Sequence, residues 1–138
     1  MKTYRIAAIP GDGIGNEVIP AGLEVLRALS SKEGFSLRTT EFDWSSDRFK
    51  KTGAYIPDGG LAELRQFDAI FFGAVGAPDV PDHLSLWGLR LPICQGFDQY
   101  ANVRPSKLLP GITSPMTNAS KIDWVIVREN TEGEYSGA

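Results

Sequence analysis

The sequence predicts an α/β fold in which helices flank a parallel sheet. Short apolar runs typical of buried strands alternate with stretches of helical periodicity, and glycine-rich turns follow two of the apolar runs. Strand, helix and strand in succession is the order that gives parallel strands joined by crossover connections.

The amino-terminal third is expected to contain a strand, a helix and a second strand. Residues 4–10 form the first apolar run and residues 35–42 the next. Between them, a helix is predicted over residues 16–30, with Pro20 in its first turn. The helical spacing is carried by the apolar or small residues Val18, Gly22, Val25, Leu26 and Leu29.

The middle of the chain predicts a short helix and a third strand. Asp58 is placed to cap a helix that reaches about Gln66. Residues 69–72 are fully apolar and form the predicted strand, followed by a glycine- and proline-rich loop over residues 73–81.

The last third predicts a helix and two more strands. Residues 85–95 are expected to be helical, although Gly88 and Pro92 disfavour a regular helix. Strands are predicted over residues 100–104 and 124–128, with a long loop between them.

Composition excludes several classes of protein. The 138 residues suit one domain, and 42% hydrophobic with 22% charged residues is ordinary for a globular protein. A net charge of -3 without a basic cluster argues against nucleic acid as a partner. The single cysteine, Cys94, cannot form an internal disulfide, so a cytoplasmic location is expected. No apolar run approaches the roughly 20 residues of a membrane span, so no membrane association is expected.

Two glycine motifs follow predicted strands. The first, residues 11–15 (GDGIG), opens a helix, where backbone N–H groups and the helix dipole can hold an anion. It is not the dinucleotide fingerprint, because Asn16 stands where the third glycine belongs. The second, residues 73–78 (GAVGAP), lies at a carboxyl edge, where open α/β sheets bind ligands. Each motif is equally compatible with a turn that only requires glycine geometry.

Arginines and a tyrosine form the third signal. Arg104 and Arg128 each end an apolar run, and the planar guanidinium suits small carboxylates. Tyr135 follows Arg128 within eight residues, and Arg90 lies on the predicted helix after the second glycine loop. The alternative is structural ion pairs or solvated charges. His83, alone in a polar loop, is expected to be solvated rather than catalytic.

The residues carry a resemblance to the β-decarboxylating dehydrogenases, the isopropylmalate/isocitrate dehydrogenase family, and within it to the tartrate/D-malate branch. Five stretches match in order and cover the whole chain: residues 9–15 (IPGDGIG), 73–76 (GAVG), 85–88 (SLWG), 100–105 (YANVRP) and 128–135 (RENTEGEY). The resemblance implies an NAD- or NADP-dependent homodimer that oxidises a 2-hydroxy acid and decarboxylates it with Mg²⁺ or Mn²⁺. It also implies an isopropylmalate-dehydrogenase-like sheet with flanking helices that is not a Rossmann fold.

The resemblance implies roles for individual residues. Arg104 and Arg128 match arginines that bind the substrate carboxylates. Tyr135 matches a catalytic tyrosine that helps to protonate the enol after carbon dioxide leaves, and a phenol with an ordinary pKa of about 10 keeps its proton at neutral pH. The positions that match the NAD-binding segments are Ile14, Gly73, Ala74, Val75, Gly76 and Leu86.

One position departs from the family pattern. A further substrate arginine is usual ten residues before the one that Arg104 matches, and Cys94 stands there. Arg90 lies about one helical turn earlier and is expected to replace it. A small acid such as tartrate or D-malate is therefore favoured as the substrate, with an isopropylmalate-type acid as the alternative.

The resemblance also predicts the organisation of the chain. Residues 1–98 match the amino-terminal part of the cofactor-side domain, and residues 99–138 match the start of a substrate and dimer domain. The family's catalytic lysine and metal-binding aspartates fall beyond Ala138, so no metal ligand is expected here and this piece alone is expected to be inactive. Two other classes remain open: a non-catalytic nucleotide-binding fragment, and an interaction protein whose arginines only form ion pairs.

Overall fold

The computed structural model describes residues 2–137 and divides the chain into two compact units, Met1–Ile93 and Cys94–Ala138. The expected boundary after residue 98 lies close to this division. The cofactor and substrate roles that were assigned to the two parts remain predictions.

A three-stranded parallel sheet forms the centre of the first unit. It contains β1 (Thr3–Gly11), β2 (Ser36–Glu41) and β3 (Ala69–Ala74), in the order β2-β1-β3. Ile6 of β1 pairs with Thr39 on one side and Ala69 on the other. The predicted parallel sheet is confirmed, and it brings the loops that follow β1 and β3 to the same edge.

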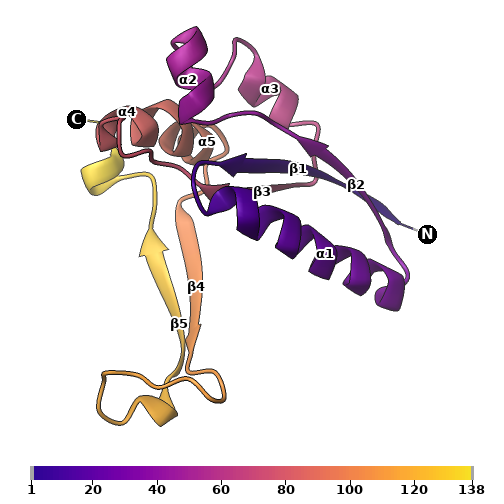
Figure 1. Cartoon of the computed structure of the whole chain (residues 1–138), viewed down its shortest axis with the longest axis vertical. Helices are drawn as coiled ribbons and strands as arrows, with labels where there is room; N and C mark the ends of the chain where they lie inside the picture. Colours follow the sequence, from indigo (N-terminus) through magenta and orange to yellow (C-terminus); the bar gives the residue numbers. More distant parts are fainter. Residues whose placement is uncertain (1, 138) are drawn as a thin grey trace. The chain divides into compact units, whose positions relative to one another are not determined.

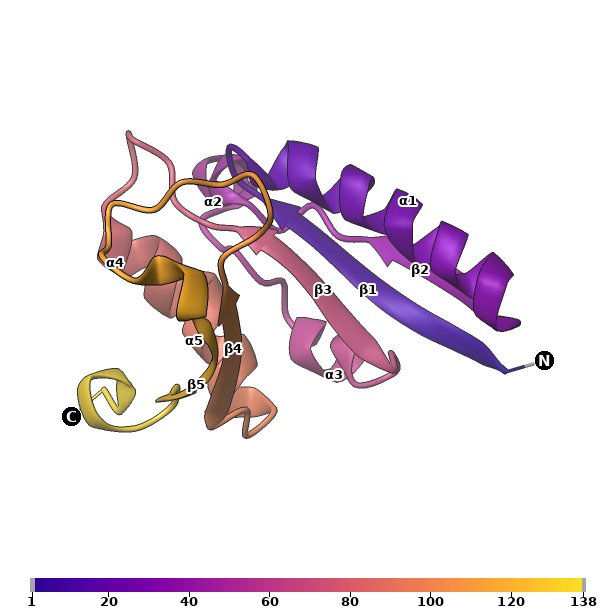
Figure 2. The ribbon, with the colours of Figure 1, turned by 90° about the horizontal axis from the view of Figure 1, so that it is seen from below.

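Helix α1 (Gly15–Glu33) lies along one face of this sheet, and α3 (Gly60–Leu64) lies on the opposite side (Figures 1 and 2). Ala8 of β1 packs against Ile19 and Leu23 of α1, with Phe71 of β3 beside them. Gly22 makes this packing possible. A Cβ at Gly22 would lie 2.5 Å from the tip of the Phe71 ring, so a larger residue here would force the ring to move.

Two details of the predicted α1 are wrong. Val18, Val25 and Leu29 of the expected apolar stripe are exposed, and Ile19 and Leu23 are the helix residues that are buried against the sheet. Pro20 lies inside the helix rather than in its first turn, because the helix already begins at Gly15.

Two short helices follow β2. The first, α2 (Ser46–Thr52), was not predicted, and it is capped by the side chain of Ser45, which accepts a hydrogen bond from the Arg48 N–H. The second is α3, for which Asp58 was expected to be the cap. That expectation is wrong, because the N-cap is Gly59, in the left-handed conformation at φ 76°, and no side chain caps the helix.

The predicted helix over residues 85–95 is confirmed as a continuous helical segment that starts earlier. It consists of α4 (Asp82–Ser85), a π-helical turn η1 (Leu86–Arg90) and α5 (Leu91–Gly96). Gly88 is required by packing, since a Cβ there would lie 2.5 Å from the Tyr55 ring.

The second unit is built on a two-stranded antiparallel ribbon. Strands β4 (Ala101–Lys107) and β5 (Asp123–Glu129) lie side by side (Figure 1). Val103 of β4 pairs with Val127 of β5. Their connection contains a 3-10 turn, η2 (Ala119–Lys121), and a second such turn, η3 (Gly133–Tyr135), follows β5. The expectation that Arg104 ends a strand is wrong, because β4 continues to Lys107.

Candidate functional site

The two glycine loops of the first unit touch at the carboxyl edge of the sheet. A Cβ at Gly11 would lie 1.8 Å from the Ala74 carbonyl oxygen, and one at Gly15 would lie 1.9 Å from that of Pro10. A Cβ at Gly73 would lie 2.3 Å from the same Pro10 oxygen. These glycines are therefore fixed by close backbone approach, in agreement with the turn interpretation of both motifs.

An acid in the first turn connects the loops. Asp12 donates its N–H to the Ala74 carbonyl at 2.7 Å. Its carboxylate accepts from the Ser46 N–H at 2.7 Å, the Ser46 hydroxyl at 2.6 Å and the Gly76 N–H at 2.9 Å. The Ser46 hydroxyl also lies 2.9 Å from the Tyr55 hydroxyl. Sequence reasoning missed this network, because Ser46 and Gly76 are 34 and 64 residues from Asp12 along the chain.

The predicted cofactor residues all lie in the first unit. Ile14 is 59% exposed at the tip of the first turn. Gly76 has φ +134° with no atom within 4 Å of the position of a Cβ, so its backbone faces open space and suits close approach by a ligand. The other predicted positions, which are partly buried, are Gly73, Ala74, Val75 and Leu86.

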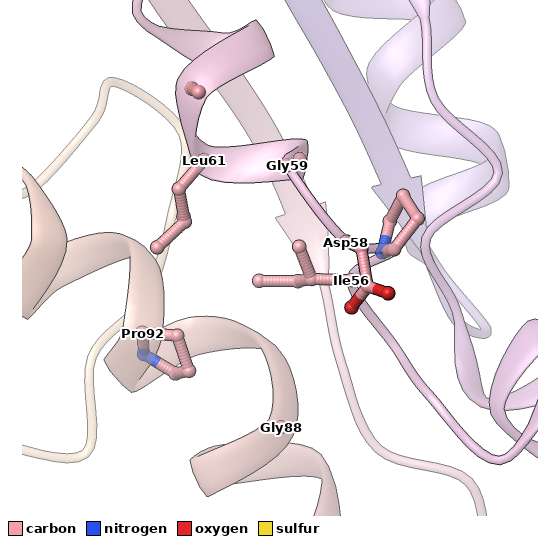
Figure 3. Close-up of a pocket in the computed structure, with 9 residues that line it drawn as sticks. Ile56, Asp58, Gly59, Leu61, Gly88 and Pro92 are labelled. Carbon is pink, nitrogen blue, oxygen red and sulfur yellow. The ribbon is translucent and has the colours of Figure 1, made fainter.

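Among the described residues, none of these six lines the hollow beside α3 or the hollow beside the first glycine turn. A hollow of about 320 Å³ opens between α3 and the η1–α5 segment, with Ile56, Leu61 and Pro92 on its walls (Figure 3). Its lining is apolar apart from Asp58, so it offers little chemistry. A smaller hollow of about 210 Å³ lies beside the first glycine turn and includes Glu41 and Asp43, whose charges would repel a phosphate.

In the second unit, the ribbon places the two arginines on one face. Asn102 is directly opposite Arg128, and Arg104 follows Asn102 by two residues, so all three side chains leave the same face of the ribbon. The Asn102 side-chain oxygen accepts a hydrogen bond from Arg104 Nε at 3.3 Å. Diagonal neighbours of this kind lie about 7–8 Å apart, which is close enough for two guanidinium groups to bind one small diacid.

Arg128 and Tyr135 are in direct contact. Arg128 Nη2 donates a hydrogen bond to the Tyr135 hydroxyl. The guanidinium carbon also lies 5.1 Å from the ring centre, within cation–π range. The prediction that these two residues act together therefore has a geometric basis.

The loop that carries Tyr135 is held at several points. The Glu129 carboxylate accepts the N–H groups of Thr131 at 2.6 Å and Glu132 at 2.7 Å, and these backbone hydrogen bonds, that of Thr131 first, lower the pKa of Glu129. Gln95 Nε2 donates to the Tyr135 carbonyl at 2.7 Å. These hydrogen bonds hold the loop in a defined conformation.

Cys94 supports the same loop. It is buried, and Asn130 Nδ2 lies 3.2 Å from its sulfur and 3.0 Å from the Gln99 carbonyl oxygen. The position that departs from the family pattern is therefore occupied by a packing residue. Sequence reasoning did not find Asn130, Gln95 or Asn102, although the place of Asn102 two residues before Arg104 on a strand was a usable signal.

Two further predicted residues lie in the first unit. Arg90 is the last residue of the π-helical turn and is partly buried, and its partnership with Arg104 and Arg128 remains a prediction. His83 is exposed in α4, as expected for a solvated histidine.

Comparison with known proteins decides the family. The model of the isocitrate/isopropylmalate dehydrogenase family matches residues 5–138. The chain belongs to this family. A probable tartrate dehydrogenase/decarboxylase of Agrobacterium vitis is 69% identical over 99% of this chain and 39% of its own length. The decarboxylating D-malate dehydrogenase of Escherichia coli is 52% identical over 99% of this chain and 39% of its own length.

Solved structures agree on the fold. A β-decarboxylating dehydrogenase from Thermococcus kodakarensis superposes with a TM-score of 0.69 at 34% identity, covering 94% of this chain and 35% of that one. The α/β fold of this family is confirmed. The chain spans about two-fifths of the length of the relatives it matches.

Neither a metal cluster nor a membrane-spanning helix occurs in the described part of the chain. Within residues 2–137, no three histidine, cysteine, aspartate or glutamate side chains gather in a way that could hold a metal ion. Over the same residues, no helix has the length and apolar character needed to span a bilayer.

Proposed function

We propose that this chain is part of an NAD-dependent oxidoreductase that oxidises and decarboxylates a small 2-hydroxy acid of the tartrate or D-malate type. The proposal is supported by family membership and by the two relatives above, whose names give tartrate and D-malate. It extends to the homodimer that the family resemblance implies.

The observation that carries the proposal is the contact between Arg128 and Tyr135, with Arg104 on the same face of the ribbon. Two fixed positive charges beside a phenol suit a substrate with carboxylates and a carbon that must be protonated. If the arginines only formed structural ion pairs, each would be paired with an acid. In the described part of the chain, Arg104 instead contacts the amide of Asn102, and Arg128 contacts the phenol of Tyr135.

The residues of the chain have separate roles in the proposed reaction. Arg104 and Arg128 bind the substrate carboxylates and orient the acid. Held beside Ile14 and Gly76, a bound NAD would supply the oxidant for the carbon that bears the hydroxyl group. Tyr135 then gives its proton to the enol carbon after carbon dioxide leaves, and the Arg128 guanidinium stabilises the phenolate that remains.

Ile14, Gly73, Ala74, Val75, Gly76 and Leu86 are the proposed NAD contacts. The exposed Ile14 side chain and the open backbone at Gly76 fit such a ligand. Within residues 2–137, no group of three metal-ligating side chains is found, so we assign none of these residues to the Mg²⁺ or Mn²⁺ of the proposal. For the same reason, the 138-residue chain assayed alone is expected to reduce no NAD.

A chimera tests the proposal. Residues 1–138 replace the matching segment of the Agrobacterium vitis relative, which is 69% identical over 140 residues, and the purified protein is assayed with Mn²⁺ and either NAD or NADP. Tartrate, D-malate and 3-isopropylmalate are compared as substrates. We expect NAD reduction with tartrate or D-malate and a much lower kcat/KM with 3-isopropylmalate.

The unmodified relative is the positive control. A folded chimera that reduces no coenzyme while the relative does so would overturn the proposal. A preference for 3-isopropylmalate or for NADP would correct the substrate or the coenzyme. Binding of NAD to the isolated 138-residue chain without any turnover in the chimera would instead favour a non-catalytic nucleotide-binding role.

A further inference from the structure

The Asp12 carboxylate joins three segments that are distant in the sequence. Asp12 lies in the turn after β1, Ser46 opens α2, and Gly76 lies in the loop after β3. One carboxylate oxygen accepts the Ser46 N–H, and the other accepts both the Ser46 hydroxyl and the Gly76 N–H. All three distances fall between 2.6 and 2.9 Å, which is the range of charge-assisted hydrogen bonds.

The donors in this network follow from chemistry. An ionised carboxylate only accepts, so the Ser46 hydroxyl gives its single proton to Asp12. The Tyr55 hydroxyl, 2.9 Å away, must then donate to Ser46. Ser46 and Tyr55 are only 1% and 2% exposed, so the network anchors Asp12 to buried groups that have few alternative partners.

The other end of the network is exposed. Gly76 lies on the surface with φ +134°, a backbone conformation that glycine alone adopts without strain, and its N–H is directed to Asp12. A second tie between α2 and this loop is the ion pair of Lys50 Nζ with Asp79 at 3.0 Å. Two contacts therefore hold the loop after β3 against α2. One runs through Asp12 to the buried Ser46, and the other is the ion pair at the surface.

We infer that Asp12 is a positioning residue for coenzyme binding, and that it acts through the Gly76 N–H to preset the loop between β3 and α4 (residues 75–81). This inference rests on the proposed function, which places NAD at that loop. Asp12 itself need not touch the coenzyme. Its carboxylate fixes the peptide at Gly76, and a loop that is already ordered loses less conformational freedom when NAD binds.

The chain offers a matched pair of variants. In Asp12→Asn, the negative charge is lost and the NH₂ group faces at least one of the three donors, so the hydrogen bond from the Gly76 N–H loses its charge assistance or breaks. In Ser46→Ala, a hydroxyl contact to Asp12 is lost, but the contact between Asp12 and Gly76 remains. Both variants lose a partly buried hydrogen bond, so both are expected to melt at lower temperature, and only Asp12→Asn should loosen the loop.

Amide hydrogen exchange of the 138-residue chain tests the geometry. We expect the Gly76 amide to exchange at least about tenfold faster in Asp12→Asn than in the wild type, and at a nearly unchanged rate in Ser46→Ala. A wild-type Gly76 amide that already exchanges as fast as an unbonded loop amide would overturn the inference, even if neither variant folds.

The chimera tests the functional consequence. Asp12→Asn should raise KM for NAD about tenfold or more, the loss expected of a charge-assisted hydrogen bond, while kcat and KM for the 2-hydroxy acid change about twofold or less. Ser46→Ala should leave all three parameters near wild type. Equal effects of the two variants, or an unchanged KM for NAD in Asp12→Asn, would reduce Asp12 to a structural residue.

The two hypotheses fail separately. A folded wild-type chimera that reduces no NAD would overturn the proposed function and this inference with it. An active chimera whose KM for NAD is unchanged by Asp12→Asn would overturn this inference but not the proposed function.

Discussion

The guanidinium group of Arg128 donates a hydrogen bond to the hydroxyl of Tyr135, and its central carbon lies 5.1 Å from the centre of the tyrosine ring. Because Arg128 donates a hydrogen bond to the phenol oxygen, the hydroxyl proton of Tyr135 points away from the guanidinium group. A phenol held in this way can give up its proton while the positive charge beside it stabilises the phenolate. Arg128 therefore has two roles in the proposed reaction, one toward the substrate and one toward Tyr135.

Tyr135→Phe in the chimera should lower kcat by roughly 10²–10⁴, the usual contribution of general acid–base catalysis. The ring and its cation–π contact with Arg128 remain, and only the hydrogen bond to the hydroxyl is lost, so KM for the 2-hydroxy acid and for NAD should change little. Single-turnover measurement is the suitable assay, because a partly rate-limiting hydride step would mask the loss. Turnover at the wild-type rate, with a loss of about 1 kcal/mol in the free energy of unfolding, would make Tyr135 a packing residue.

Replacement of Arg104 or Arg128 by lysine should raise KM for the 2-hydroxy acid and cost about 2 kcal/mol or more in kcat/KM, because a point charge cannot reproduce the planar fork. Arg128→Lys should also lower kcat more than Arg104→Lys, since Arg128 is the one that contacts Tyr135. Steady-state kinetics of both variants measure this difference. Wild-type kinetics in both, at unchanged melting temperature, would contradict a role in substrate binding.

Arg90→Ala tests whether Arg90 replaces the arginine that is missing at Cys94. We expect the Kd of the 2-hydroxy acid to rise and that of NAD to stay within about twofold, because a guanidinium that binds a carboxylate contributes to that ligand alone. Separate calorimetric titrations of the chimera with each ligand provide the comparison. Equal weakening of both ligands would mean that Arg90 supports the fold of its helical turn.

The Glu129 carboxylate should make the stability of the second unit depend on pH. Its pKa is lowered in the folded chain by the backbone N–H groups of Thr131 and Glu132, so its stabilising effect is complete above the ordinary glutamate pKa and disappears as the pH falls through the lowered value. The difference in melting temperature between wild type and Glu129→Gln should therefore be complete at about pH 6 and shrink as the pH falls below the ordinary glutamate pKa of about 4.3. A difference that stays constant over this range would contradict the assignment.

Ser45→Ala should destabilise α2 by about 1 kcal/mol, because the Ser45 side chain accepts the Arg48 N–H at the start of this helix. Ser45→Gly should cost less, since glycine is tolerated at an N-cap. Thermal or urea unfolding of the 138-residue chain measures both. Negligible losses in both variants would show that the cap contributes little to this helix. The hydrogen bonds between Asp12 and Ser46 and the ion pair between Lys50 and Asp79 would then be what holds it in place.

Much of the fold was predictable because its strongest patterns are local. The apolar runs that became β1, β3 and β5 are short and uninterrupted, and the alternation with helices predicts parallel strands. Helix α2 was missed because its seven residues, SDRFKKT, contain a single aromatic residue and no apolar period. Asp58 was one position too early for a cap, a distinction that depends on the left-handed conformation of Gly59.

The candidate site, like the fold, could be predicted from the sequence only in part. Arg104, Arg128 and Tyr135 belong to local motifs, and the pairing of β4 with β5 places the two arginines on one face. Asp12 could be recognised as part of a glycine turn, but its partners Ser46 and Gly76 are brought to it only by the packing of α2 and the parallel pairing of β1 with β3. No spacing in the sequence indicates such contacts.

The most direct test of the proposed reaction is to measure NADH and carbon dioxide together when the chimera acts on D-malate. We expect one carbon dioxide to be released for each NADH formed, with both products lost together in Arg128→Ala. NADH without carbon dioxide would restrict the activity to oxidation. A folded chimera that forms neither product, while the Agrobacterium vitis relative forms both under the same conditions, would show that the chain does not support oxidative decarboxylation.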